Sequence, residues 1–433
     1  MKLISLKIEK LFEMFDYDIL LRNSENLLIV TGPNGFGKTM ILNIIFNFFN
    51  KKFLFFQKLV FNKITIVLDD NISIVISKKI ENDKPHLKFI FFQDKDELDS
   101  FEYSDKLEID FERTIQRYLP IRRIDASTWL DVRINKLLTI DNLINEYVPQ
   151  LPEEIANNLL RIKSKKINEI LDSINVHLIR EQRLFIKVQN VERNIHDEKE
   201  QTIMLETIQT YANELKQLIS LNLQQSIKIS QQLDSSYPDR LVKEKNTLTE
   251  KEYQVRFDKL KEKQEKLAKN GLYESKQQFL GYSKDDSKAL LVYLDDLEQK
   301  LGAFDNLLEK LELFTGILND RRFVFKTIQV DREKGFYFLT SKGKELALNQ
   351  LSSGEQNEVV LLYELIFNAK PNTLVLIDEP EISLHITWQK EFLNDLLKII
   401  KIQNIQVMIA THSPSIINDR WDLVYNLENT LAK

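Results

Sequence analysis

The sequence contains no cysteine among its 433 residues. Disulfide bonds, cysteine-based zinc sites, thiol catalysis and thiol redox sensing are therefore excluded. An excess of basic charge is also absent, because 60 Lys and Arg stand against 65 Asp and Glu and give a formal net charge of −5. No global positive field therefore indicates a nucleic-acid partner, although this count does not exclude a local basic patch.

Long apolar runs are missing too. The most apolar region, residues 40–61, is interrupted by several Asn, Gln and Lys side chains and cannot supply the roughly 20 apolar residues of a membrane span. The N-terminus reads as strand-forming sequence rather than as a signal peptide. We therefore expect a cytoplasmic protein with no membrane contact. The hydrophobic content of 43% and charged content of 29% are those of an ordinary globular protein.

A glycine-rich stretch follows a short apolar run near the N-terminus. Residues 27–30 are Leu-Leu-Ile-Val, which is typical of a buried parallel strand. Residues 32–39 are Gly-Pro-Asn-Gly-Phe-Gly-Lys-Thr, and an apolar helix is expected from about residue 40 to 49. Strand, G-x-x-x-x-G-K-T and helix in this order form the P-loop pattern. The predicted nucleotide-binding residues are Gly32, Asn34, Gly35, Gly37, Lys38 and Thr39.

The residue types of this loop suit a phosphate. Glycines let the backbone curl until several N–H groups face one phosphate, and Lys38 adds a cation that reaches the terminal phosphates. The Thr39 hydroxyl is of the type that binds Mg²⁺. The loop therefore predicts a nucleotide site with Mg²⁺.

Two later buried strands end in residues that suit the same site. Residues 373–378 end in Asp378-Glu379, and residues 405–410 lead into Thr411-His412. A carboxylate at the end of a parallel strand would lie where Mg²⁺ needs an outer-sphere ligand, which favours Asp378. Glu379 is then placed to orient or deprotonate the water that attacks the γ-phosphate, and His412 to contact that phosphate. The alternative is a pair of exposed acids and an unrelated histidine at strand-to-loop transitions.

A second candidate anion site lies at residues 351–356, Leu-Ser-Ser-Gly-Glu-Gln, before a pattern that predicts a strongly amphipathic helix. Ser352 and Glu355 have the spacing of a capping box. The free N–H groups and the dipole of a helix start favour an anion. This hexapeptide alone is equally compatible with a well-capped core helix that binds no ligand.

Two regions are expected to be helical. Residues 111–173 carry a helical pattern. Their most basic run, residues 161–166, is interpreted as a solvated helix face in preference to a contact with a polyanion. Residues 198–318 predict a short arm of three helices, with breaks at Ser235-Ser236-Tyr237-Pro238 and at Asn270-Gly271. We therefore divide the chain into an N-terminal lobe (1–195), an arm (196–320) and a C-terminal lobe (321–433).

In these motifs the chain resembles an ABC-type ATPase head of the SMC, Rad50 and OLD group. The matching segments are the Walker A loop at 32–39, the signature at 351–356, the Walker B end at Asp378-Glu379 and the switch residue His412. Gln182 falls at the family's Q-loop position and residues 381–385 at its D-loop position. The resemblance implies an α/β fold, with a P-loop mixed sheet, flanking helices and a short coiled-coil insertion. It also implies ATP and Mg²⁺ as cofactors, with Thr39, Gln182 and Asp378 as metal ligands and Glu379 and His412 as catalytic residues.

The resemblance further implies a head-to-tail dimer, which could assemble into a higher homo-oligomer. The signature of one subunit would then contact the nucleotide held by Lys38 of the other, through Ser352, Ser353, Gly354 and Glu355. Met40 departs from the family, which usually has a second Ser or Thr there, so one phosphate contact is expected to be missing. The arm is short and has no Cys-x-x-Cys hook, which argues against a long-range DNA tether.

The string Asp-Glu-Pro-Glu-Ile-Ser-Leu-His at 378–385 and the short arm resemble ATPase subunits of bacterial anti-phage systems of the PARIS and Septu types. The resemblance implies a separate effector, a TOPRIM- or HNH-type nuclease, and a phage protein or DNA as the trigger. Only about twenty residues follow His412, so we expect no nuclease domain in this chain. The alternative function is a Rad50- or SMC-like repair or recombination ATPase that acts on DNA; a transporter ATPase is disfavoured by the large insertion before the signature.

Overall fold

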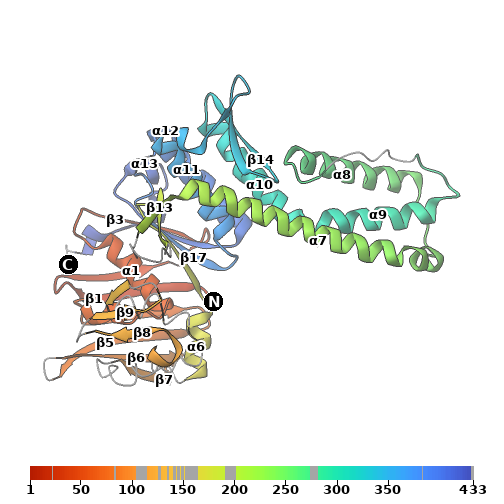
Figure 1. Cartoon of the computed structure of the whole chain (residues 1–433). Coiled ribbons are helices and arrows are strands. Elements are labelled where there is room, and N and C mark those ends of the chain that lie inside the picture. Colours follow the sequence, from red (N-terminus) through yellow and green to blue (C-terminus); the bar gives the residue numbers. More distant parts are fainter. Residues whose placement is uncertain are drawn as a thin grey trace. The chain divides into compact units, whose positions relative to one another are not determined.

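A computed structural model describes residues 1–21, 23–81, 84–103, 115–124, 128–133, 136–139, 143, 147, 151, 164–190, 201–273, 281–382 and 384–430. The chain divides into two compact units, residues 1–204 with 368–433, and residues 205–367. Residues 321–367, which we expected in a C-terminal lobe, group with the arm instead (Figure 1). No helix within the described residues has the length and apolar character needed to cross a membrane.

A five-stranded parallel sheet is the framework of the first unit. Its order is β11 (Asn175–Ile179), β17 (Thr373–Asp378), β18 (Gln406–Ala410), β3 (Leu27–Thr31) and β19 (Val424–Asn426). β17 and β18 are buried along their whole length, as their continuous apolar sequence predicts for strands covered on both faces. The three strands expected from the sequence, β3, β17 and β18, are confirmed, whereas β19 was not anticipated, because only three residues carry it.

The first unit also contains a six-stranded antiparallel sheet. Its order is β2 (Phe15–Leu20), β1 (Leu3–Leu11), β4 (Lys63–Leu68), β5 (Ile72–Glu81), β6 (Lys84–Gln93) and β7 (Asp96–Tyr103). β4 alternates buried and half-buried residues, as expected for a strand with one face on the core. The Gln406 side chain ties the two sheets together, because it accepts a hydrogen bond from Leu3 N–H (3.2 Å) and donates one to Leu3 C=O (2.8 Å).

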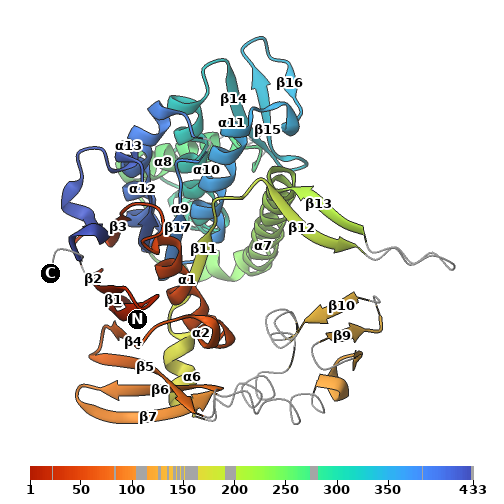
Figure 2. The same ribbon diagram turned by 90° about the vertical axis from the view of Figure 1, so that its left-hand side faces the viewer.

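Helix α1 (Lys38–Phe49) packs against both of these sheets. It contacts β11, β17 and β18 of the parallel sheet. Phe48 of the helix also stacks on Phe89 of β6, with ring centroids 6.3 Å apart. The short helix α2 (Leu54–Lys58) contacts β6 as well (Figure 2). Buried rings of this kind contribute large apolar area, so the cluster fixes the orientation of the helix that begins at Lys38. The unit also contains α12 (Ile386–Gln403) and α13 (Pro414–Ile417).

The described part of residues 111–173 differs from the helical prediction. A three-stranded antiparallel sheet is present, with β8 (Ile121–Arg123), β9 (Thr128–Asp131) and β10 (Lys136–Thr139), and α6 (Lys165–Asp172) follows it. The segment Thr-Trp-Leu-Asp at 128–131 is rich in β-branched and aromatic side chains, which favour a strand. Residues 161–163 of the basic run lie outside the described residues, whereas Lys165 and Lys166 are exposed in the first turn of α6. Two short strands, β12 (Phe185–Asn190) and β13 (Gln201–Glu206), pair beyond β11.

The second unit holds the arm. It consists of α7 (Thr207–Lys243), α8 (Glu250–Lys269), α9 (Ser287–Gly302) and α10 (Asp305–Ile317), followed by a π-helical turn at Leu318–Arg322. α7 and α8 each pack against α9 (Figure 1). The predicted start of the first helix at residue 198 was wrong, because β13 occupies residues 201–206.

The predicted break at Ser235-Ser236-Tyr237-Pro238 was also wrong, since α7 continues through Pro238. Proline removes one N–H donor and crowds the preceding turn. Neighbouring side chains bond carbonyl groups of that turn: Ser236 Oγ donates to Gln232 C=O at 3.0 Å, and Arg240 donates to Leu233 C=O at 2.8 Å. Arg240 also forms an ion pair with Asp296 of α9, which links this turn of α7 to the neighbouring helix.

The second unit ends in a small sheet and the helix that follows it. β14 (Lys326–Asp331), β15 (Gly335–Thr340) and β16 (Glu345–Leu346) form the sheet, and α11 (Ser353–Tyr363) is extended by a π-helical turn at Glu364–Asn368. Gly335 has φ = 76°, and a Cβ there would lie 1.9 Å from the Ala212 carbonyl oxygen of α7. Glycine is therefore required for this hairpin to pack against the N-terminal part of α7.

Candidate ATP-binding and hydrolysis site

The carboxyl ends of three parallel strands meet at one edge of the sheet. Asp378 is in register with Ala410, and Ala410 with Val30. The ladder continues beyond the strands, because Glu379 N–H donates to Ala410 C=O at 2.8 Å and Thr411 N–H donates to Val30 C=O at 3.1 Å. The residues that follow β3, β17 and β18 therefore lie side by side, at the edge where open α/β sheets bind ligands.

The loop after β3 curls around its own lysine. Gly35 and Gly37 adopt φ of 88° and 84°, which is the left-handed region that glycine occupies without strain. The Lys38 ammonium donates hydrogen bonds to Gly32 C=O (2.8 Å) and Pro33 C=O (3.4 Å) and is almost fully buried. This is the local geometry expected of a P-loop, with backbone N–H groups and one cation gathered at a helix start. Asn34 lies exposed on the loop.

Thr39 and Asp378 are brought together from positions far apart in the sequence. Thr39 Oγ1 donates to Asp378 Oδ1 at 3.1 Å. Burial raises the pKa of Asp378, while the hydrogen bond from Thr39 and the charges of Arg180 and Lys38 lower it in part. A hydroxyl and a carboxylate are the hard oxygen ligands that Mg²⁺ prefers, so this pair fits the predicted metal.

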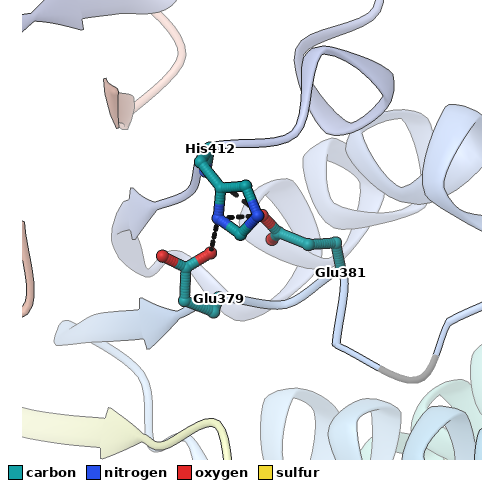
Figure 3. A group of neighbouring side chains, drawn as sticks. All are labelled: Glu379, Glu381 and His412. Carbon is teal, nitrogen blue, oxygen red and sulfur yellow. Dashed lines mark hydrogen bonds and ion pairs between the residues drawn. The ribbon is translucent and has the colours of Figure 1, made fainter. Parts of the chain in front are cut away.

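Glu379 lies between Lys38 and His412. Its Oε2 is 2.6 Å from His412 Nδ1 (Figure 3). Its Oε1 is 3.9 Å from the Lys38 ammonium. The residue has φ = 44°, a left-handed conformation that is strained for glutamate. Backbone strain of this kind concentrates at functional positions and persists only where the surroundings enforce it. The backbone of Glu379 is held here on both sides, because its N–H donates to Ala410 C=O and its C=O accepts from Ile382 N–H at 3.2 Å.

The pKa of Glu379 is raised to about 7. Burial is the largest cause, and the neighbouring Glu381 carboxyl raises the pKa further. His412 acts in the opposite direction, because its charge and hydrogen bond favour the carboxylate. A carboxylate with a pKa near neutrality is a stronger base than an ordinary glutamate and is matched to general-base catalysis.

Glu381 was not among the predicted site residues, although the sequence placed it in the segment at the D-loop position. Its Oε1 accepts hydrogen bonds from Thr411 Oγ1 (2.6 Å) and His412 N–H (3.1 Å), and it lies 3.3 Å from His412 Nδ1. Glu379, Glu381 and His412 thus form one cluster (Figure 3). This cluster fits a zinc site poorly. The ligand atoms of a tetrahedral zinc ion are about 3.3 Å apart, whereas His412 Nδ1 and Glu379 Oε2 are at hydrogen-bond distance.

The loop after β11 lies at the same edge of the sheet, since Ile179 is in register with Ile377 of β17. Gln182 is exposed, and in the described part of the chain no hydrogen bond joins it to Thr39 or Asp378. Its role as a metal ligand stays a prediction.

Charged neighbours of Gln182 interact with residues of the site and were missed from the sequence. Glu181 raises the pKa of Asp378 and Arg180 lowers it. Arg183 donates to Pro380 C=O at 3.1 Å, which links this loop to the residues after the Walker B acids. Ser383 of the D-loop segment lies outside the described residues.

The signature residues belong to the second unit and start α11. Ser352 Oγ accepts from Glu355 N–H at 3.3 Å, while Ser352 N–H donates to Glu355 Oε2 at 2.8 Å, which confirms the predicted capping box. Ser352 and Ser353 are exposed, and Gly354 lies in the first turn. The helix is not amphipathic as predicted, because residues 357–363 are all buried.

Lys326 of β14 is a further residue of this helix start that sequence reasoning missed. Its ammonium lies 2.7 and 2.8 Å from the two Glu355 oxygens. Burial would raise the pKa of Glu355, but the hydrogen bonds from Lys326 and Ser352 outweigh it and hold the pKa below its usual value. The capping carboxylate is therefore ionised, and a lysine compensates its charge.

The model of the AAA ATPase domain family matches residues 1–417. Similarity to curated proteins is confined to shorter stretches. Protein ea59 of Escherichia phage lambda is 34% identical over 92 residues, or 21% of this chain and 17% of that protein. Retron Ec83 probable ATPase of Escherichia coli is 29% identical over 103 residues, or 21% of this chain and 19% of that protein. The chain thus spans about a fifth or less of the length of these two relatives.

One further curated protein and two solved structures are also similar to parts or all of the chain. The lipoprotein-releasing system ATP-binding protein LolD of Rickettsia typhi is 37% identical over 82 residues, or 19% of this chain and 35% of that protein. Among solved structures, an Smc head domain with an extended coiled coil from Pyrococcus furiosus is 13% identical, with 96% of this chain and 90% of that chain covered and a TM-score of 0.35. The SMC head domain from Thermotoga maritima is 11% identical, with 98% and 94% covered and a TM-score of 0.33. Scores at this level support no inference about activity or partners.

Proposed function

Because the chain belongs to the AAA ATPase domain family, we propose that it binds ATP with Mg²⁺ at the P-loop and hydrolyses it to ADP and phosphate. The observation that carries this proposal is the convergence of Lys38, Thr39, Asp378, Glu379 and His412 at one edge of the parallel sheet. Each of these residue types has a distinct use in phosphoryl transfer. Together they supply a cation, oxygen ligands for Mg²⁺, a general base and a group that orients the base.

Binding begins at the P-loop. The free N–H groups at the start of α1 and the Lys38 ammonium attract the β- and γ-phosphates. Lys38 is held by Gly32 and Pro33, so its charge is already aimed at the phosphate position before ATP arrives. Thr39 and Asp378 would hold Mg²⁺, directly and through water respectively, and the ion would supply charge compensation on the phosphates.

Hydrolysis needs a base beside the γ-phosphate. Glu379 would accept the proton of the attacking water, for which it must be ionised. His412 contacts Glu379 at 2.6 Å and fixes the direction of one of its carboxylate oxygens. The other oxygen faces the side on which Lys38 lies, where a water between base and γ-phosphate would be placed.

We further propose a head-to-tail dimer in which Ser352, Ser353, Gly354 and Glu355 of one subunit contact the nucleotide on the partner. Exposure of Ser352 and Ser353 and the free N–H groups of α11 support this role. The ion pair between Lys326 and Glu355 supports it as well, because an uncompensated carboxylate at the helix start would repel a phosphate. Such dimers could form higher homo-oligomers.

The biological role that fits these features best is a sensor and scaffold subunit in anti-phage defence. In this role the ATPase would hold a separate nuclease effector, of TOPRIM or HNH type, and respond to a phage protein or DNA. The support is the similarity to a retron ATPase, together with the defence-type string at 378–385. Co-purification of the products of adjacent genes, before and after phage infection, tests it. Recovery of DNA ends instead of a nuclease would favour a repair ATPase.

The ATPase proposal is tested with Glu379→Gln, which keeps the shape of the side chain and removes the base. We expect turnover to fall to near background, while ATP still drives association measured by light scattering. Ser352→Arg should leave nucleotide binding by the monomer unchanged and abolish ATP-driven association. The matched control is Glu102→Gln on β7, an exposed glutamate of the antiparallel sheet. Unaltered turnover in Glu379→Gln, or loss of ATP binding in Ser352→Arg, would contradict the assignments.

A further inference from the structure

Glu381 lies between β17 and α12, where its side chain is buried with 8% of its surface exposed. Its Oε1 atom receives two hydrogen bonds from the loop that follows β18. One comes from the hydroxyl of Thr411, a fully buried residue, at 2.6 Å, and the other from the backbone N–H of His412 at 3.1 Å. A single carboxylate oxygen therefore anchors the first two residues of that loop.

The His412 ring has little else to hold it. Its side chain is 57% exposed, so packing does not fix its orientation. In the described part of the chain, the side chains bonded to the ring are Glu379 at 2.6 Å and Glu381 at 3.3 Å. An exposed imidazole can adopt several rotamers at low cost. The position of this ring therefore depends on the two glutamates and on the backbone bond from His412 N–H to Glu381.

The second oxygen of Glu381 adds an independent argument. Oε2 is buried and has no hydrogen-bond partner among the described residues. Buried polar atoms are nearly always paired, and an unpaired one in a folded protein calls for a functional explanation. A smaller polar residue could satisfy Thr411 without burying that atom, so stability alone does not account for a glutamate here.

We propose that Glu381 is a positioning residue for ATP hydrolysis, which holds the loop at Thr411 and His412 so that the imidazole meets Glu379. Glu381 itself does not touch the substrate. Thr411 keeps its carboxylate in place, and Glu381 in turn restricts the His412 ring to the side of the base. This inference rests on the proposed ATPase function and extends it to a residue that acts through His412.

The test compares three substitutions with the control Glu102→Gln. Glu381→Ala removes the acceptor, and kcat should fall on the order of a hundredfold, the loss typical of a catalytic group displaced by about 1 Å. KM for ATP should stay close to its wild-type value, because the P-loop is not altered. Glu381→Gln keeps an amide oxygen that can accept from Thr411 and His412, so it should restore most of kcat. Thr411→Val, which removes only the hydroxyl donor, should give an intermediate loss.

A spectroscopic readout separates positioning from general damage. In protein labelled at histidine, the His412 imidazole resonance, assigned by its loss in His412→Asn, should move toward that of an exposed free imidazole in Glu381→Ala but not in Glu381→Gln. Equal losses of kcat in the Ala and Gln variants, or an unshifted resonance in Glu381→Ala, would overturn the inference. Wild-type protein that binds ATP without turnover would refute the ATPase function instead, while the resonance would still report on positioning.

Discussion

The raised pKa of Glu379 predicts that ATP hydrolysis depends steeply on pH near neutrality. The group must be ionised to accept a proton, and burial followed by the Glu381 carboxyl raises its pKa to about 7. With that value the ionised fraction is roughly 10% at pH 6 and 90% at pH 8, so kcat/KM should rise about tenfold over this interval. We choose kcat/KM because it reports the pKa of the free enzyme.

The assay is phosphate release at saturating Mg²⁺ and at ATP concentrations well below KM, from pH 5.5 to 9. Two variants should shift the midpoint of the pH profile of kcat/KM in opposite directions. Glu381→Gln removes a carboxyl that raises the pKa of Glu379, so the midpoint should move to lower pH. His412→Gln removes a group that lowers this pKa, so the midpoint should move to higher pH in whatever activity remains. A profile that is flat between pH 6 and 8 would refute the reasoning.

The raised pKa of Glu379 also affects the free energy of unfolding, which can be measured without an activity assay. Below pH 4.5, the ordinary value for glutamate, Glu379 is neutral in both folded and unfolded chains and has no effect. Between pH 4.5 and about 7 the folded chain retains a proton that the unfolded chain has lost, so stability decreases as pH rises through this window. The full loss above pH 7 is about 3 kcal/mol, from 1.36 kcal/mol per pKa unit. Glu379→Gln should therefore become more stable than the wild type above pH 7, but not at pH 4, in denaturant titrations without nucleotide.

Three other substitutions test separate parts of the structure. Thr39→Val removes the hydroxyl bonded to Asp378 and should raise the Mg²⁺ concentration needed for half-maximal turnover; an unchanged Mg²⁺ dependence would remove Thr39 from the metal site. Lys326→Met leaves the Glu355 carboxylate uncompensated, so ATP-driven association should weaken at least tenfold, and binding of ATP to the monomer should not change. Pro238→Ala should stabilise the chain by about 2 kcal/mol in denaturant titrations, because it restores an N–H donor inside α7; a loss of stability would show that the arm requires this proline.

The parts of the fold that were predictable are those with a local signal. The run at 27–30, the loop at 32–39 and the helix after it follow from composition and spacing, and the structure has all three. The same is true of Asp378-Glu379, because a continuous apolar run ending in acids indicates a buried parallel strand. The capping box of α11 was equally predictable, since its two residues, Ser352 and Glu355, lie within four positions of each other.

The parts that were not predictable depend on contacts between distant residues. The sequence around Lys326 does not indicate its bond to Glu355, because the β14–β15 hairpin brings Lys326 to the start of α11. α7 continues through Pro238, where Arg240 bonds Leu233 C=O and pairs with Asp296 of another helix, a contact that no local pattern indicates. The burial of α11 on all sides, which contradicts its amphipathic reading, likewise results from packing that no single segment encodes.

Glu381 shows why a motif can be seen while its chemistry is missed. The string that contains it marked a D-loop position, yet nothing local distinguishes this glutamate from an ordinary exposed acid. Its meaning comes from the parallel register of β17 and β18, which places Thr411 and His412 beside the segment after Asp378. Because one register sets both the Glu379–His412 contact and the Glu381–Thr411 contact, a change that shifts β18 should disturb both together. A substitution confined to α11 should disturb neither, since its cap is built from Ser352, Glu355 and Lys326 of the other unit.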